Sequence, residues 1–128
     1  MPSISLTRWG LRACIVQPIY FKEFTMKTSE LTGAALDWAV AKCEGLAVSV
    51  RATQWRAENC PHKYSTDWLL GGPIIEREEI CMLAPVRGLW RSINMGRTQY
   101  GPTPLIAAMR CYVASKLGDD VDIPEELL

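Results

Sequence analysis

The segment from Tyr64 to Arg77 carries the side chains best suited to binding a ligand. Its two glycines would let the backbone approach a ligand, amides near Pro73 could hold an anion, and its aromatic rings could stack on a base. The same residues could instead cap a helix, fill the core and make a tight join. No Gly-Lys-Ser/Thr follows the diglycine, so the segment is not a phosphate loop. The candidate ligand-binding residues are Tyr64, Ser65, Thr66, Asp67, Trp68, Gly71, Gly72 and Arg77, together with Trp90 and Arg91 further along the chain.

Catalytic arrangements have weaker support in the sequence. Asp67, Glu76 and Glu79 could supply an acid/base pair, and His62 could act as a base for Ser65 or Cys60. Neither arrangement has a motif context such as a nucleophile elbow. We therefore predict no catalytic residue.

Three arginines, Arg87, Arg91 and Arg97, could form a local basic patch for a nucleotide or phosphate. Alternating exposed positions on a sheet face explain them equally well. The whole chain has 14 basic and 14 acidic residues, which argues against a non-specific nucleic-acid binder. The five tryptophans belong either to the core or, where exposed, to an interface or stacking platform.

The 5 cysteines are odd in number and irregularly spaced, which fits neither a disulfide framework nor a zinc site. Cys60-Pro61-His62 is the nearest approach to a metal motif, and no second pair completes it. We predict no metal, no cofactor and reduced cysteines. No apolar run reaches the ~20 residues of a membrane span, and no signal-peptide core is present, so we expect a soluble, cytoplasmic protein.

The first elements predicted around the candidate site lie between Leu31 and Lys63. A helix is expected over 31–44, capped by Thr28 or Ser29, with Trp38 facing inward and an acidic, solvated stripe on the opposite side. That stripe consists of Glu30, Asp37 and Glu44. A short strand over 45–50 and a loop over 51–63 follow.

The second half of the chain predicts a broken or two-part helix over 66–79, with a strand over 74–83 as the alternative. Next come a hairpin of strands 80–84 and 89–94, and a helix from Pro104 to Leu117 with Thr103 as its N-cap. The acidic tail 119–128 is expected at the surface. This order predicts an α+β fold, with a small antiparallel sheet packed by helices.

Three blocks, residues 26–41, 64–77 and 101–110, resemble the NinX family of tailed bacteriophages and prophages of enteric bacteria. The middle and last blocks also look like the broader phage alpha-beta-alpha sandwich domains. Most members of this family have no known function. The resemblance implies a domain over 26–128 and leaves 1–25 as an extension outside it, because family members usually begin near Met26.

The resemblance implies a non-catalytic phage accessory protein that binds a host protein or a small nucleotide-like ligand, as a homo-oligomer in the host cytoplasm. A sharper hypothesis is that it sequesters a nucleotide-derived signal of host defence. The alternatives are an enzyme that processes nucleotides or nucleic acids and a DNA- or RNA-binding regulator.

Overall fold

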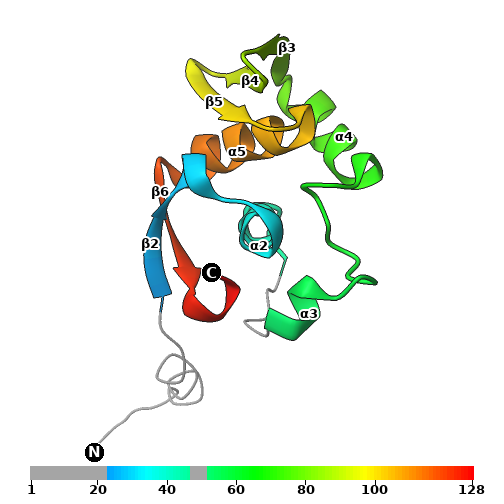
Figure 1. Cartoon of the computed structure of the whole chain (residues 1–128), viewed down its shortest axis with the longest axis vertical. Helices are drawn as coiled ribbons and strands as arrows, with labels where there is room; N and C mark the ends of the chain where they lie inside the picture. The colour runs from blue at the N-terminus through cyan, green and yellow to red at the C-terminus, as the bar shows by residue number, and fades with distance from the viewer. Residues whose placement is uncertain (1–22, 47–51) are drawn as a thin grey trace, which may run out of the picture.

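The protein has the predicted α+β fold, in which two small antiparallel sheets pack around helices (Figure 1). The computed structural model describes residues 23–46 and 52–128. The predicted strand over 45–50 lies largely outside these residues. Within them, no helix is long and apolar enough to cross a membrane.

Helix α5 (Pro104–Leu117) is the middle layer of the fold. The three-stranded sheet lies on one side of it and helix α2 on the other (Figure 1). The predicted start is confirmed, because the Thr103 side chain accepts a hydrogen bond from the Ile106 N–H and Pro104 occupies the first turn. Among its fully buried side chains are Met109, Cys111 and Tyr112.

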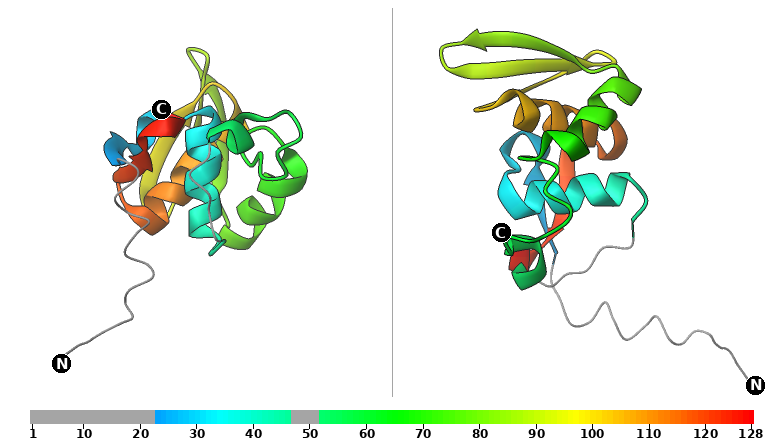
Figure 2. Two further views of the ribbon diagram at one scale, coloured as in Figure 1. Left: turned by 90° about the horizontal axis from the view of Figure 1, so that it is seen from below. Right: turned by 90° about the vertical axis from the view of Figure 1, so that its right-hand side faces the viewer.

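The predicted hairpin is also confirmed, as strands β3 (Cys81–Val86) and β4 (Leu89–Asn94). Its turn is shorter than expected: Val86 pairs with Leu89, and both Arg87 and Gly88 take positive φ angles, as a two-residue type I′ turn requires. A third strand, β5 (Arg97–Gly101), pairs with β4 and was not predicted. The hairpin tip projects beyond the helices (Figure 2).

The five acids of the tail are exposed, as expected, but the tail is also a strand that contributes to the core, which the sequence did not predict. Strand β6 (Asp120–Pro124) pairs antiparallel with β2 (Glu23–Lys27), and the 3-10 turn η3 (Glu125–Leu127) follows it. Val121, Ile123 and Leu127 are buried, while the acids between them face solvent. Three residues of the predicted extension, 23–25, take part in this pairing.

Helix α2 (Gly33–Cys43) starts later than predicted. Thr28 and Ser29 do not cap it; they belong to a separate 3-10 turn, η2 (Thr28–Glu30), and the Thr28 hydroxyl donates to the Gly118 carbonyl oxygen. The predicted loop over 51–63 also contains a short helix, α3 (Ala52–Arg56). Trp55 is buried there, because α3 packs against α2 and η3.

Helix α4 (Trp68–Glu78) is one continuous helix and not the broken one expected. Asp67 caps it by accepting from the Leu69 N–H, as its residue type predicted. Pro73 lies inside the helix and removes the hydrogen bond to the Leu69 carbonyl. Because Leu69 is 83% exposed, water can reach the carbonyl that Pro73 leaves unpaired.

The adjacent glycines of α4 provide a matched test of this packing. A Cβ on Gly71 would lie 2.4 Å from Leu105 Cδ1 and 3.1 Å from the Tyr64 carbonyl oxygen, whereas one on Gly72 meets nothing within 4 Å. We expect Gly71→Ala to lower the free energy of unfolding by about 1–3 kcal/mol through overpacking. Gly72→Ala should raise it by about 0.5–1 kcal/mol, because alanine is the better helix former. Urea unfolding of both variants measures these changes, and equal effects would contradict the packing at Gly71.

Candidate functional site

The segment from Lys63 to Asp67 connects α3 to α4 and lies across α2. The Ser65 N–H donates to Asp37 Oδ1 at 2.8 Å, in a buried hydrogen bond between positions 28 residues apart. Tyr64 and Ser65 are buried, whereas Thr66 is exposed. The segment is therefore fixed at its middle residue and presents Thr66 to solvent.

Asp37 was expected on a solvated acidic stripe, and this prediction is wrong. The side chain is only 4% exposed, because the 63–67 segment covers that face of α2. Burial raises the pKa of Asp37 above its ordinary value, while the hydrogen bond from Ser65 and the nearby charge of Lys63 oppose the rise. Sequence periodicity placed this residue with Glu30 and Glu44 and contained no signal of its burial.

An open cavity of about 390 Å³ lies where the 63–67 segment meets the start of α2. We call it the α2 pocket. No side chain caps the start of α2 and no acid lies in its first turn, so the first backbone N–H groups remain available beside the pocket. The pocket is lined by Thr32, Gly33, Ala34, Asp37, Trp55, Arg56, Lys63, Ser65, Thr66 and Leu127.

Two cationic side chains line the α2 pocket. Arg56 donates to the Leu128 carbonyl oxygen at 3.1 Å, so part of its guanidinium is already engaged. Lys63 is half-buried and forms no ion pair with the residues that the structure describes. Neither cation belonged to the predicted site, although both come from the polar segment that sequence analysis treated as a loop.

Aromatic rings hold the residues next to the pocket in place. The His62 ring stacks on Tyr64, with ring centres 6.2 Å apart and planes 10° apart. Trp55 packs on His62 at 5.7 Å in a tilted arrangement. Of these three rings, Trp55 lines the α2 pocket, while His62 and Tyr64 flank Lys63, which lines it as well.

A second, smaller cavity of about 190 Å³ lies next to the α2 pocket and shares Ser65 and Thr66 with it. We call it the Trp68 pocket; Trp68, Thr103, Leu105 and Ile106 complete its lining. Trp68 was expected either in the core or as a stacking platform. It is 50% exposed, which contradicts the core assignment and leaves a ring face accessible.

The remaining predicted site residues lie elsewhere. Gly71 packs against the core, and Gly72 faces open space. Arg77 ion-pairs with Glu44 at 2.7 Å and with Glu78 at 2.9 Å. Trp90 and Arg91 are on the three-stranded sheet, beyond α5. Of the ten predicted residues, the structure brings together Ser65, Thr66 and Trp68, with Tyr64 and Asp67 adjacent to them in the chain.

Arg77 takes part in a cluster that joins three helices. It donates to Glu44 at the end of α2 and to the Tyr112 hydroxyl on α5, and the Tyr112 hydroxyl donates to Glu44. The hydrogen bond from Arg77 lowers the pKa of Glu44, and burial raises the pKa of Tyr112. These internal contacts explain Arg77 without a ligand.

The potential metal ligands and nucleophiles do not form a clear reactive site. No group of three or more His, Cys, Asp or Glu side chains gathers among residues 23–46 and 52–128. The described cysteines are free thiols, of which Cys111 is buried and Cys81 exposed. Burial raises the pKa of Cys43 to about 12, so this thiol is not activated as a nucleophile.

Comparison with known protein families identifies a model that covers most of the chain. The family model described as bacteriophage P22, NinX, matches residues 27–116. This range includes α2, α4, the three-stranded sheet and most of α5. None of the curated proteins compared with the chain matches it.

Substitution of Asp37 separates its charge from its hydrogen bond. Because burial raises the pKa in the folded state, this carboxyl favours folding most at low pH, and that contribution is lost as the pH rises from about 4 through the raised folded pKa. We expect the free energy of unfolding of the wild type to fall relative to Asp37→Asn over that range. Urea unfolding at several pH values measures the difference, and a difference independent of pH would contradict the buried charge.

Asp37→Ala serves as the companion variant. Asparagine keeps an oxygen that can accept from the Ser65 N–H, whereas alanine leaves that buried N–H without a partner. We expect Asp37→Ala to be less stable than Asp37→Asn by about 1–3 kcal/mol. Equal stability of the two variants would mean that the hydrogen bond does not hold the segment.

Proposed function

This chain belongs to the bacteriophage P22 NinX family, and from that premise we propose that it is a non-catalytic accessory protein of phage infection. It binds a small, anionic, nucleotide-like molecule of the host cell in the α2 pocket. The observation that carries the proposal is a single cavity lined by the uncapped start of α2, by Lys63 and by Asp37. Its volume of about 390 Å³ lies within the usual range of small-molecule sites.

The α2 pocket matches the mixed chemistry of a nucleotide. A phosphate fits the positive end of α2 beside Lys63, where backbone N–H groups and an ammonium would both donate to it. Asp37 offers the opposite chemistry, because its carboxylate can accept from a base N–H or a sugar hydroxyl. A simple anion would not use this acceptor, whereas a nucleotide would use both ends of the pocket.

The Trp68 pocket adds a second cavity, in which the base of a nucleotide could lie. It shares Ser65 and Thr66 with the α2 pocket, so a ligand can reach both cavities past the exposed Thr66. Trp68 is half-exposed there, and a base stacked on it is worth about 1–3 kcal/mol. Phosphate binding in one cavity and base stacking in the other favour a nucleotide over inorganic phosphate.

Capture of the ligand, without chemical change, fits the contacts of the pocket residues. Asp37 already accepts the Ser65 N–H, and the His62 ring lies against two other rings. A phage protein with such a pocket would remove a nucleotide-derived defence signal from the host cytoplasm by holding it. An enzyme would release a changed molecule instead.

Ligand recovery tests the proposal. Purified protein is incubated with nucleotide extracts from cells whose nucleotide-signalling defences are active, then washed and denatured, and the released molecules are identified by mass spectrometry. We expect an unaltered nucleotide in molar proportion to the protein. Absence of any retained nucleotide, or release of a chemically altered one, would overturn capture.

A charge reversal locates the binding site. We expect Lys63→Glu to weaken binding of the recovered nucleotide by about 10–100-fold, because it removes a charged hydrogen bond and adds repulsion. Lys27→Glu, the same change on the exposed strand β2 and outside both pockets, should alter affinity by less than about twofold. Isothermal titration calorimetry measures both, and equal losses would place the ligand elsewhere.

A further inference from the structure

The three-stranded sheet has its polar and apolar residues on unexpected sides. Ser92, Asn94 and Gln99 are buried on the face toward α5, where the Cys111 thiol donates to the Ser92 carbonyl oxygen. Ser92 Oγ and Asn94 Nδ2 have no hydrogen-bond partner among the described residues. A sheet with one face in water normally turns its polar residues outward.

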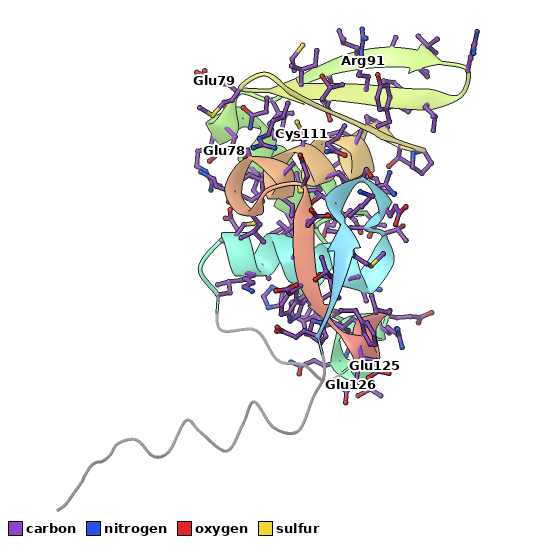
Figure 3. All side chains as sticks on the ribbon, turned by 90° about the vertical axis from the view of Figure 1, so that its left-hand side faces the viewer. Glu78, Glu79, Arg91, Cys111, Glu125 and Glu126 are labelled. Atoms are coloured by element: carbon purple, nitrogen blue, oxygen red, sulfur yellow. The ribbon has the colours of Figure 1, made fainter. Side chains whose placement is uncertain are left out.

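The opposite face, which we call the outer sheet face, is apolar and cationic. The strand register places Leu83, Arg91 and Tyr100 side by side in one row and Cys81, Ile93 and Thr98 in the next. Figure 3 shows Arg91 on the sheet at one end of the molecule, with Glu125 and Glu126 at the other end. Tyr100 is 50% exposed, and none of the helices within residues 23–46 and 52–128 covers this face (Figure 2).

A cavity of about 240 Å³ lies on the outer sheet face near the hairpin tip. We call it the hairpin pocket; its lining consists of Val86, Arg87, Leu89, Arg91 and Tyr100. Val86 is 70% exposed and Leu89 47%. Tyrosine and arginine around an apolar hollow are typical of the residues that dominate protein–protein binding energy.

The charge on this surface is uncompensated. The guanidinium groups of Arg87 and Arg91 form no hydrogen bond or ion pair with residues 23–46 or 52–128, whereas Arg97 pairs with Asp119 at 3.0 Å. The sequence from Ile80 to Gly101 contains no acidic residue. A partner must therefore bring negative charge of its own.

The positive charge of Arg87 and Arg91 also argues against two other occupants of the outer sheet face, a second copy of the chain and the chain's own N-terminal segment. A second copy docked face to face by two-fold symmetry would bring Arg91 against the arginines of its partner. The chain before strand β2 cannot supply acids either, because residues 1–22 contain Arg8, Arg12 and Lys22 and no Asp or Glu. Both occupants would increase the positive charge at the hairpin pocket.

The mode of docking follows from the edge strand. Pro85 lies in β3, which is an edge of the sheet, and the register shifts between Leu83 and Val86. Proline and a bulge both hinder the addition of another strand at an edge. Addition of a strand at the β3 edge is therefore disfavoured, which favours contact with the face through side chains.

We propose that the outer sheet face docks an acidic segment of a partner protein, with one apolar side chain in the hairpin pocket and carboxylates paired with Arg87 and Arg91. This interaction is separate from the nucleotide-like ligand proposed above. A single-stranded nucleic acid fits less well, because such surfaces stack successive bases on several aromatic rings. Here Tyr100 is accompanied by aliphatic residues, and the register places Trp90 on the face toward α5.

Unbiased peptide selection tests this proposal. A random dodecapeptide library displayed on bacteria is selected against the immobilised full chain, and the enriched peptides are sequenced. We expect acidic residues next to a leucine or aromatic residue. No enrichment, or enriched peptides without acids, would overturn the proposal.

Matched variants then locate the binding of the enriched peptide by fluorescence polarisation. Arg91→Glu and Tyr100→Ala should each weaken it by at least about tenfold, and Lys27→Glu by less than about twofold. Circular dichroism checks that each variant is folded. Undiminished affinity of Arg91→Glu would overturn the proposal.

Two further measurements test the alternative occupants. The proposal predicts that a labelled uridine oligonucleotide does not bind the wild type at physiological salt. If the full chain self-associates in sedimentation velocity, we expect Arg91→Glu to leave this self-association unchanged. Binding of the oligonucleotide without binding of the peptide would identify the occupant of the outer sheet face as a nucleic acid. Self-association that Arg91→Glu abolishes would identify it as a second copy of the chain.

Discussion

The hydrogen bond from the Ser65 N–H to Asp37 is the constraint on which the candidate site depends. A buried carboxylate is costly unless a donor meets it, and a buried N–H is costly unless it finds an acceptor. Lifting of the segment that covers α2 would break this buried hydrogen bond. Because Ser65 is fixed, Thr66 opens onto both cavities and Tyr64 turns inward to stack on His62. The α2 pocket therefore exists because a helix and a loop distant in sequence share one buried polar contact.

Helix α5 separates this site from the outer sheet face. The α2 pocket is lined by the start of α2, while the three-stranded sheet packs against the opposite side of α5 from α2 (Figure 1). The Arg77, Glu44 and Tyr112 cluster holds α2, α4 and α5 together between these two surfaces. A small phage protein built in this way has room for a ligand on one side and a partner on the other.

Local chemistry made part of this structure predictable. Thr103 with Pro104 marked the start of α5, and Asp67 was one of three cap-type residues that marked that of α4. The spacing of the strands and the turn residues Pro85 to Gly88 marked the hairpin. The features that the sequence did not predict depend on contacts with residues distant in the chain. Val121 and Ile123 alternate with acids, but the tail becomes a strand only because β2, almost 100 residues away, pairs with it. The sequence pattern groups Asp37 with Glu30 and Glu44, which are more exposed, and only the covering loop distinguishes it.

The central claim is that Asp37 holds the 63–67 segment against α2 in the folded protein. Amide hydrogen exchange followed by NMR tests it most directly, because exchange of a buried, hydrogen-bonded N–H requires the segment to open. We expect the Ser65 amide to exchange as slowly as the core amides of α5, and the Thr66 amide, whose acceptor lies in the same exposed turn, to exchange faster. Ser65 exchange as fast as that of Thr66 would show that the segment opens independently and that Asp37 does not hold it.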